Sequence, residues 1–318
     1  MNLSAVSKLS EEEARQYFEA IRWPNGPVCP HCGPAKATKG VTRLEGKKHR
    51  IGLYDCKDCQ QQFTSTIGTI LEDTHLPIRT WLMAFAIMCS AKKGISALQL
   101  QRQLGIGSYR SAWHLCHRIR HAMGKEPMKG LLLGANGGTV QVDETYVGGK
   151  PRRGGKKSHA GRGTNKTPVV ALIERGGRAR AHVVPDVTAK TLKQSIRDNV
   201  DVSARIMTDE LRSYRGLEKE FAGGHDVVRH SAGEYARDDV NTNEAEAYFS
   251  LLKRGLVGSF HHVSKRHLPK YIDEFSFRWD LRKANDSERT GAAIKAAEGK
   301  RLMLKEPKAA ETLSFWEM

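Results

Sequence analysis

The spacing of hydrophobic positions changes several times along the chain, and these changes predict segments of different structure. Residues 1–20 carry a few apolar side chains at helical spacing, which predicts a short helix. Residues 24–66 hold paired cysteines and little aliphatic core, whereas residues 77–124 have a helical period. Residues 138–282 begin with the alternation of strands and end with helical spacing. The charged, Ala-rich stretch 286–318 predicts a helix with a loose end.

Within 138–282 the pattern resolves into individual strands and helices. We expect strands at 139–146, 168–173 and 179–184, with Gly176-Gly177 as the turn of a hairpin between the last two. A helix over 192–200, strands over 204–209 and 226–229, and a helix over 243–254 follow. Three strands, a helix, two strands and a helix form the element order of a ribonuclease-H-like α/β domain.

Four of the six cysteines are spaced as ligands of one metal ion. Cys29 and Cys32 form one CxxC pair, Cys56 and Cys59 form another, and 23 residues separate the pairs. A two-residue gap lets both thiolates of a pair bind the same ion, and four thiolates complete a closed tetrahedral site. The sequence therefore predicts a zinc ribbon with a structural Zn²⁺, whose binding supplies folding energy that so small a segment lacks.

The segment before residue 130 predicts a helical module with a short turn. Ser96 begins one helix, Gly105-Ile106-Gly107 forms the turn, and Ser108 begins the next helix. That last helix has one apolar stripe, and basic side chains occupy its other faces: Arg110, His114, His117, Arg118, Arg120 and His121. The pattern resembles a helix-turn-helix in which Arg110 and Arg118 contact DNA. An ordinary three-helix unit with a solvated basic face is the alternative.

The charge of the chain favours a polyanionic partner. Its 318 residues include 52 Lys and Arg against 35 Asp and Glu, a formal charge of +17. Nucleic acid explains such an excess better than a membrane surface, because no lipidation motif or long basic amphipathic helix is present. No apolar run reaches the length of a membrane span, and the acidic N-terminal stretch lacks the order of a signal peptide, so we expect a cytoplasmic protein without membrane contact.

Acidic residues at the ends of predicted elements suggest a second metal site. Asp143 points away from the apolar face of its strand, and Asp209 ends a buried strand. A helical wheel places Asn243, Glu246 and Lys253 on one flank beside an apolar stripe. Phosphoryl transfer with two divalent ions needs carboxylates on a rigid frame. We expect Asp143 to bridge the ions, Asp209 to be the second ligand, Glu246 or Asn243 to complete the set, and Lys253 to contact a DNA phosphate.

Further charged residues surround these positions. Glu144, Glu210 and Glu244 are neighbours for which we expect structural roles. The segment 150–166 is rich in glycine and has no acid, and its cations are expected to clamp DNA: Lys150, Arg152, Arg153, Lys156, Lys157, Arg162 and Lys166. A charged hairpin loop is the alternative interpretation. Arg254 follows Lys253 and is expected to contact DNA as well.

Several joined motifs resemble the transposases of zinc-ribbon bacterial insertion sequences, relatives of the eukaryotic Merlin elements. The motifs are Val142-Asp-Glu-Thr-Tyr-Val-Gly-Gly149, Thr208-Asp-Glu210, Val240-Asn-Thr-Asn243 with Glu246 and Ser250-Leu-Leu-Lys-Arg254, His261-His-Val-Ser264, and Tyr271 with Glu274-Phe275 and Phe277-Arg278. The resemblance covers about residues 20–285. Small departures at Ala247-Tyr248-Phe249 and at Asp280 affect packing more than metal binding.

The resemblance implies a DDE-type catalytic domain with two Mg²⁺ or Mn²⁺ ions, DNA ends and target DNA as partners, and a homo-oligomer that holds two ends together. Family members have Asn or Glu as the third active-site residue, followed by Lys. Both Asn243 and Glu246 are present here, and the seven-residue spacing from Glu246 to Lys253 favours Glu246.

Together these observations predict a multidomain α+β protein. Its expected parts are an N-terminal helix (1–23), a zinc ribbon (24–74), a helix-turn-helix-like module (75–130), a ribonuclease-H-like catalytic domain (136–285) and a C-terminal tail (286–318). The leading hypothesis is an insertion-sequence transposase. A DNA-binding regulator with a silent C-terminal domain and an RNA-processing nuclease are the two alternatives.

Overall fold

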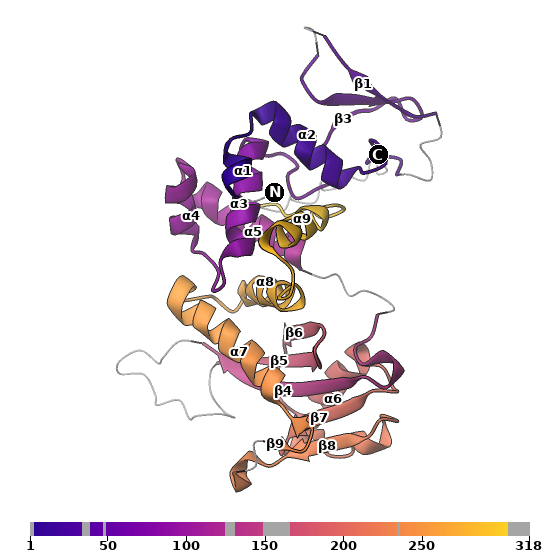
Figure 1. Ribbon diagram of the computed structural model, residues 1–318, viewed down its shortest axis with the longest axis vertical. Helices are drawn as coiled ribbons and strands as arrows, with labels where there is room; N and C mark the ends of the chain where they lie inside the picture. The colour runs from indigo at the N-terminus through magenta and orange to yellow at the C-terminus, as the bar shows by residue number, and fades with distance from the viewer. Residues whose placement is uncertain are drawn as a thin grey trace, which may run out of the picture.

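The computed structural model places a small sheet and a helical bundle at one end of the molecule and a five-stranded sheet at the other (Figure 1). The structure describes residues 3–33, 39–46, 49–124, 131–148, 166–233 and 236–304. Within these ranges, no helix combines the length and the apolar character needed to cross a membrane.

A three-stranded antiparallel sheet contains the second cysteine pair. Its strands are β1 (Val41–Leu44), β2 (Leu53–Cys56) and β3 (Gln62–Thr64), in that order. Gly52 precedes β2 with φ +75°, and a Cβ there would lie 2.4 Å from a guanidinium nitrogen of Arg15. The left-handed backbone conformation therefore favours glycine here, and a larger residue would also displace the Arg15 side chain.

Two N-terminal helices pack on the bundle. They are α1 (Leu3–Ser7) and α2 (Glu11–Arg22), and α2 begins with a capping box in which Ser10 and Glu13 bond each other's backbone nitrogens. Phe18 of α2 is buried in the core of the bundle. The helix predicted at the start of the chain is thus present, as two helices.

The helical bundle contains α3 (Ile78–Ser90), α4 (Ala97–Leu104), α5 (Tyr109–Met123) and α9 (Asp286–Lys295). Ser96 caps α4 as expected, and Gly105 ends it in the left-handed conformation, with φ +64°. The helix predicted after residue 286 is present, but it is not a peripheral tail. Ala293 and Ile294 are buried in the core of the bundle, so sequence spacing underestimated how α9 packs on α2 and α3.

The basic surface predicted for α5 is largely wrong. From Leu115 to Arg120 every residue is buried, because α5 lies among α3, α4, α8 and α9. The predicted DNA contact Arg118 is 7% exposed, lies over the Trp81 ring and donates to the carbonyl oxygen of Glu72. Only the first turn of α5, with Arg110, is exposed. Cys89 and Cys116 are buried core residues, as expected.

The second sheet has the strand order β6-β5-β4-β7-β8. Its strands are β4 (Thr139–Val147), β5 (Thr167–Glu174), β6 (Ala179–Val183), β7 (Arg205–Asp209) and β8 (His225–Val228). β4, β5 and β6 are antiparallel, whereas β7 and β8 are parallel to β4. All five strands were predicted from the sequence, with small shifts at their ends.

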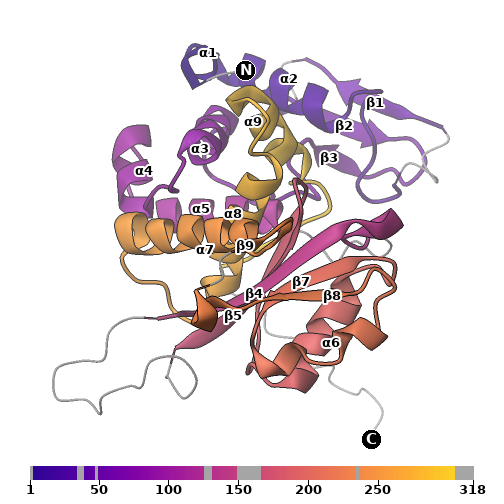
Figure 2. The ribbon, with the colours of Figure 1, turned by 60° about the horizontal axis from the view of Figure 1, so that its bottom comes forward.

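Helices cover both faces of this sheet (Figure 2). On one face α6 (Ala189–Asn199) packs on Val140 and Val142, and on the other α7 (Asn243–Gly255) and α8 (Leu268–Asp280) pack on Val169 and Ala171. A π-helical turn follows α7 at Leu256–Phe260, and β9 (Ala236–Arg237) pairs with β10 (Val240–Asn241) in a small ribbon. Short 3₁₀ turns lie at Ala135–Gly137, Arg212–Tyr214, Leu217–Lys219 and His230–Ala232. The sheet thus lies between two helical layers.

A buried ion network joins the bundle to the sheet domain. Glu274 of α8 is 0% exposed and lies 2.6 Å from Arg120 of α5 and 2.6 Å from Arg278. Arg278 also donates to the carbonyl oxygens of Met88 and Ala91 at the end of α3. One carboxylate therefore holds three helices together.

Candidate metal centres

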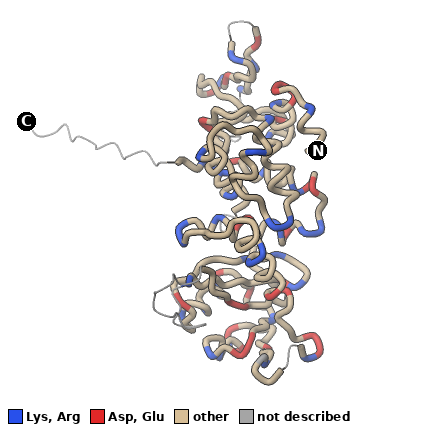
Figure 3. The backbone as a smooth tube through the Cα atoms, turned by 90° about the vertical axis from the view of Figure 1, so that its left-hand side faces the viewer, with Lys and Arg blue, Asp and Glu red and all other residues tan. Residues whose placement is uncertain are grey.

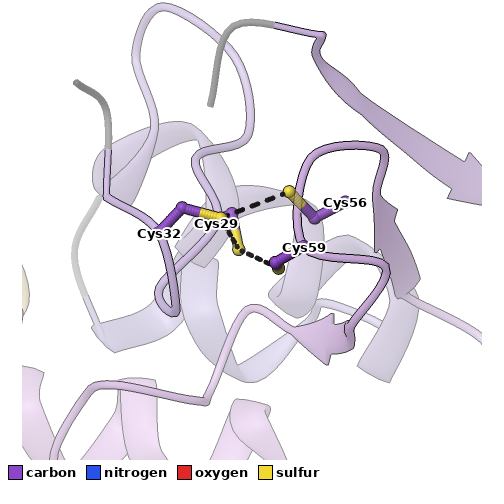
Figure 4. Close-up of side chains that lie close together, drawn as sticks. All are labelled: Cys29, Cys32, Cys56 and Cys59. Atoms are coloured by element: carbon purple, nitrogen blue, oxygen red, sulfur yellow. Dashed lines mark hydrogen bonds between the residues drawn. The ribbon is translucent and has the colours of Figure 1, made fainter. Parts of the chain in front are cut away.

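The four paired cysteines meet at one point, as Figure 4 shows. Their sulfur atoms all lie within 4.8 Å of one another, with Cys32 3.6 Å from Cys29 and from Cys56, and Cys29 3.7 Å from Cys59. Thiolates about 2.3 Å from a tetrahedral zinc ion are separated by about 3.8 Å. The cluster therefore fits a structural Zn²⁺, as predicted, with no position left for a reacting group.

The surroundings of the cysteines favour the thiolate of Cys56, whereas contact with the other cysteines raises the pKa of Cys32 and burial raises that of Cys59. The backbone amides of Cys59 and Asp58 lower the pKa of Cys56 to about 7. Tyr54 and Phe63 stack with ring centroids 5.6 Å apart beneath the cluster, and Trp23 packs edge-on against both. These aromatic side chains are almost the whole apolar core of the ribbon, so metal binding must supply much of its stability.

Asp143 and Asp209 lie at the same level of the second sheet. The last paired positions of β4 and β7 are Gln141 and Met207, and each aspartate is two residues further along its parallel strand. Val140 and Val142 face α6, so Asp143 faces the opposite side, where α7 lies. The structure thus places Asp143 as its strand pattern predicted.

The pKa of Asp143 reflects a gathering of acids around it. Burial and the nearby charges of Glu144, Asp209 and Glu246 raise its pKa from 3.8 to about 7. Its Oδ1 accepts the backbone N–H of Glu144 at 2.8 Å. The oxygens of Asp143, Asp209 and Glu246 do not all lie within 4.8 Å of one another. Because a two-ion site distributes its ligands over ions about 3.5–4 Å apart, a wider spacing than that of the thiolates is compatible with it.

Helix α7 presents the remaining predicted residues from one flank. Ala245, Phe249 and Leu252 are buried against the sheet, as the helical wheel predicted. Asn243, Glu246, Lys253 and Arg254 are exposed on this helix. The hydroxyl of Thr242 donates to Glu246 at 3.3 Å. Glu246 is thus close enough to act on Asp143 electrostatically, and Lys253 lies two helical turns further along.

Gln141 positions the start of α7, and sequence reasoning missed it. Its side chain is fully buried, its Oε1 accepts the backbone N–H groups of Glu244 (2.9 Å) and Ala245 (3.2 Å), and its Nε2 donates to Asn241 (3.1 Å). These contacts satisfy backbone groups that a helix leaves unpaired at its first turn. A polar residue inside a buried strand, on the same face as Asp143, was the signal that could have revealed it.

The three neighbouring glutamates make structural contacts, as expected. Glu144 accepts the phenol of Tyr214 at 2.7 Å, Glu210 accepts the backbone N–H of Ser231 at 3.1 Å, and Glu244 accepts the backbone N–H of Gly176 at 3.0 Å. Tyr214 is 1% exposed, so Glu144 is held firmly beside Asp143. The hydrogen bond from Ala179 N to Asp280 Oδ1, 2.7 Å long, gives Asp280 a packing role too.

The predicted DNA-contacting residues have different surroundings. Arg110 and Lys166 are exposed, and Arg118 is buried. Lys150, Arg152, Arg153, Lys156, Lys157 and Arg162 lie outside the described residues. Figure 3 shows Lys and Arg spread along both halves of the described chain. A single basic element therefore does not account for the excess positive charge.

Comparisons with known proteins identify two transposase domains in this chain. Residues 135–280 match the family described as the ISXO2-like transposase domain, and residues 9–62 match the transposase zinc-ribbon domain. A protein of Halobacterium salinarum, described as an uncharacterized protein in transposable element ISH50, is 30% identical over 286 residues, which cover 86% of this chain and 92% of the relative. The chain therefore belongs to the zinc-ribbon transposases of insertion sequences that carry the ISXO2-like domain.

Proposed function

We propose that this chain is an active DDE-type transposase that cuts DNA at the ends of its element and joins them to target DNA. The observation that carries the proposal is that the charges of Glu144, Asp209 and Glu246 all act on the half-buried carboxyl of Asp143 and raise its pKa, with Asp209 at the same level of the sheet. A carboxyl whose pKa is raised by burial and by neighbouring carboxylates is typical of a site that needs a cation or a proton. The sheet order with α6 and α7 on opposite faces supports a ribonuclease-H-like domain.

In this proposal Asp143, Asp209 and Glu246 hold two Mg²⁺ or Mn²⁺ ions, with Asn243 beside them. When bound, such ions activate a water or a 3′-hydroxyl and stabilise the leaving oxygen. The oxygen of water attacks the phosphorus at the element end, the bond to the 3′-oxygen breaks, and a 3′-hydroxyl is released. That hydroxyl then attacks a phosphorus of target DNA and displaces the 3′-oxygen of the neighbouring target nucleotide. Both steps are phosphoryl transfers, and no protein nucleophile takes part.

Exposed cations supply the DNA contacts of the proposal. Lys253 and Arg254 project from the helix that carries Glu246, so they would bind phosphates beside the reacting one. Arg110 on the first turn of α5 and Lys166 would add contacts, as would the other cations of 150–166, which lie outside the described residues. Arg118 is left out of this set because its guanidinium is buried. Two copies of the chain would hold the two ends of one element.

A strand-transfer assay tests the proposal. Purified zinc-loaded protein is mixed with labelled end DNA, target DNA and Mg²⁺ or Mn²⁺, beside the variants Asp143→Asn and Asp209→Asn. We expect metal-dependent products from the wild type and none from either variant, with end binding unchanged. Products that persist in Asp143→Asn would refute the metal-site assignment. Tight binding of the element's own ends without products in any protein would instead support the regulator with a silent domain.

The same assay separates the two candidates for the third residue. Glu246→Gln keeps the size of the side chain and removes its charge, whereas Asn243→Ala removes an amide. If Glu246 is the third ligand, Glu246→Gln abolishes products and Asn243→Ala reduces them only partly. The reverse ranking would assign the role to Asn243. Glu288→Gln, at an exposed glutamate that caps α9, is the matched control.

A further inference from the structure

A basic, aromatic cavity lies between α5 and α8, on elements that the proposed chemistry does not use. Its volume is about 480 Å³, which falls within the range of small-molecule sites. It is lined by Trp113, His114, His117, Arg266, His267, Lys270 and the segment 302–304. No carboxylate is among these residues. The cavity therefore combines planar rings with positive charge that its own lining does not neutralise.

Three rings form one wall of the cavity. The Trp113 ring centroid lies 4.0 Å from that of His117 and 5.1 Å from that of His267, and the two histidine rings are 5.0 Å apart. Trp113 and His267 are partly exposed. Aromatic faces accessible from a basic cavity are the surfaces on which nucleobases stack.

The imidazole of His117 is a buried polar group that has no hydrogen-bond partner in the part of the chain that the structure describes. Its side chain is 1% exposed, and neither Nδ1 nor Nε2 has a hydrogen-bond partner among the described residues. Burial and the nearby charges of Arg120 and His267 lower its pKa to about 3, so the ring is neutral and offers one donor and one acceptor. The rings of Trp113 and His267 pack against this imidazole, so His117 supports the two accessible rings and does not itself meet a ligand.

Two cations lie on the same cavity. Arg266 is exposed in the turn before α8, and Lys270 is half-buried in the first turn of that helix. Burial, together with the charge of Arg266, lowers the pKa of Lys270. The pKa of His267 is lowered by burial and by both of these cations. An anion bound between them would relieve this repulsion, and a phosphate has the charge to do so.

We propose that this cavity binds one nucleotide of a DNA strand, unstacked from its neighbours, with the base against the partly exposed rings of Trp113 and His267 and its phosphate on Arg266 and Lys270. The inference rests on the proposed function, because a DNA strand is the ligand that a transposase presents. Unstacked bases that stack on aromatic side chains are a common mode of single-strand recognition. The site would hold a strand end away from the duplex, on the opposite side of α8 from the sheet.

The test measures binding of two fluorescein-labelled strands to the full-length, zinc-loaded protein. One is a 12-nucleotide oligo-dT and the other is a deoxyribose-phosphate strand of equal length without bases. Trp113→Leu and His117→Leu are expected to weaken oligo-dT binding roughly 5- to 100-fold and to leave binding of the abasic strand unchanged. Lys270→Met should weaken both, whereas Lys190→Met, which removes an exposed charge on α6, should weaken neither more than about 2-fold.

Thermal unfolding of His117→Leu separates a binding role from a structural one. Because no hydrogen bond of the imidazole is lost, the midpoint without DNA should stay the same or rise. If the wild type cuts DNA and oligo-dT binding is unchanged in Trp113→Leu and His117→Leu, the nucleotide site in the cavity is refuted and the proposed function stands. A wild type that binds neither strand nor duplex and cuts nothing would overturn both.

Discussion

The side-chain oxygen of Gln141 lies 2.9 Å from the backbone nitrogen of Glu244, and this contact joins the strand of Asp143 to the helix of Glu246. Gln141 and Asp143 lie on the same face of β4, so the amide that holds the helix and the carboxylate that would bind metal share one strand. A contact outside both residues therefore helps to position the start of the helix of Glu246 relative to Asp143.

Replacing Gln141 with Leu should impair both stability and cutting. The backbone N–H groups of Glu244 and Ala245 would lose their acceptor, at a cost on the order of 1–3 kcal/mol in unfolding free energy. The start of α7 would also be less fixed, so strand-transfer rates should fall by more than stability explains. Urea unfolding and the strand-transfer assay measure the two effects. Gln103→Leu, at an exposed position of α4, is the control, and equal behaviour of the two variants would contradict the positioning role.

Asp143→Asn should stabilise the protein when no Mg²⁺ or Mn²⁺ is added. The pKa of Asp143 is raised from 3.8 to about 7, so the native state binds this proton more tightly than the unfolded chain does. Asp143 therefore has no effect on native stability below about pH 4. It lowers the stability progressively as the pH rises from 4 to 7, and its full destabilising effect is present above pH 7. The variant lacks this cost, which is on the order of a few kcal/mol.

Unfolding at several pH values checks that prediction. The difference between Asp143→Asn and the wild type should be absent at pH 4 and largest above pH 7. Added Mg²⁺ should stabilise the wild type and not the variant, since ligands stabilise only the state that binds them. Asp198→Asn, at an exposed position of α6, is the control. A difference in stability that does not depend on pH would mean that the pKa of Asp143 is not raised in the native state.

The strands and the helical wheel of α7 could be predicted because their signals are local. Alternation along β4 fixes the direction of Asp143, and the spacing of Ala245, Phe249 and Leu252 fixes the face that α7 buries. The cysteine pairs are also local, and the spacing within each pair predicted a cluster that the structure contains. Each of these predictions needed only the residues of one or two segments.

The basic face of α5 was misjudged because the partners of its cations are remote in sequence. Arg120 is neutralised by Glu274, which lies 154 positions later, and Arg118 is held by the backbone of Glu72. A helical wheel contains no information about such contacts, so buried cations were read as solvent-facing ones. The burial of α9 escaped prediction for the same reason, since its partners α2 and α3 lie near the other end of the chain.

Glu274→Ala should destabilise the protein far more than loss of a surface ion pair. The change leaves Arg120 and Arg278 buried without their carboxylate, and removal of one member of a buried pair costs about 3–5 kcal/mol. Asp286→Ala removes the partner of Arg289 at an exposed position and should cost about 0–1 kcal/mol. Chemical denaturation of both variants makes the comparison. Similar losses in the two would show that the network does not hold α5, α8 and α3 together.

Loss of one cysteine ligand should remove zinc and unfold the ribbon without unfolding the sheet domain. Cys59→Ser leaves three thiolates, and a ribbon whose core is little more than Trp23, Tyr54 and Phe63 cannot hold its fold without the ion. Metal analysis should give one zinc per wild-type chain and much less for the variant. Limited proteolysis should then cut within residues 24–66. Cys116→Ala, at a buried cysteine of α5 outside the cluster, should keep the zinc and the protection. Full zinc content in Cys59→Ser would contradict the four-cysteine site.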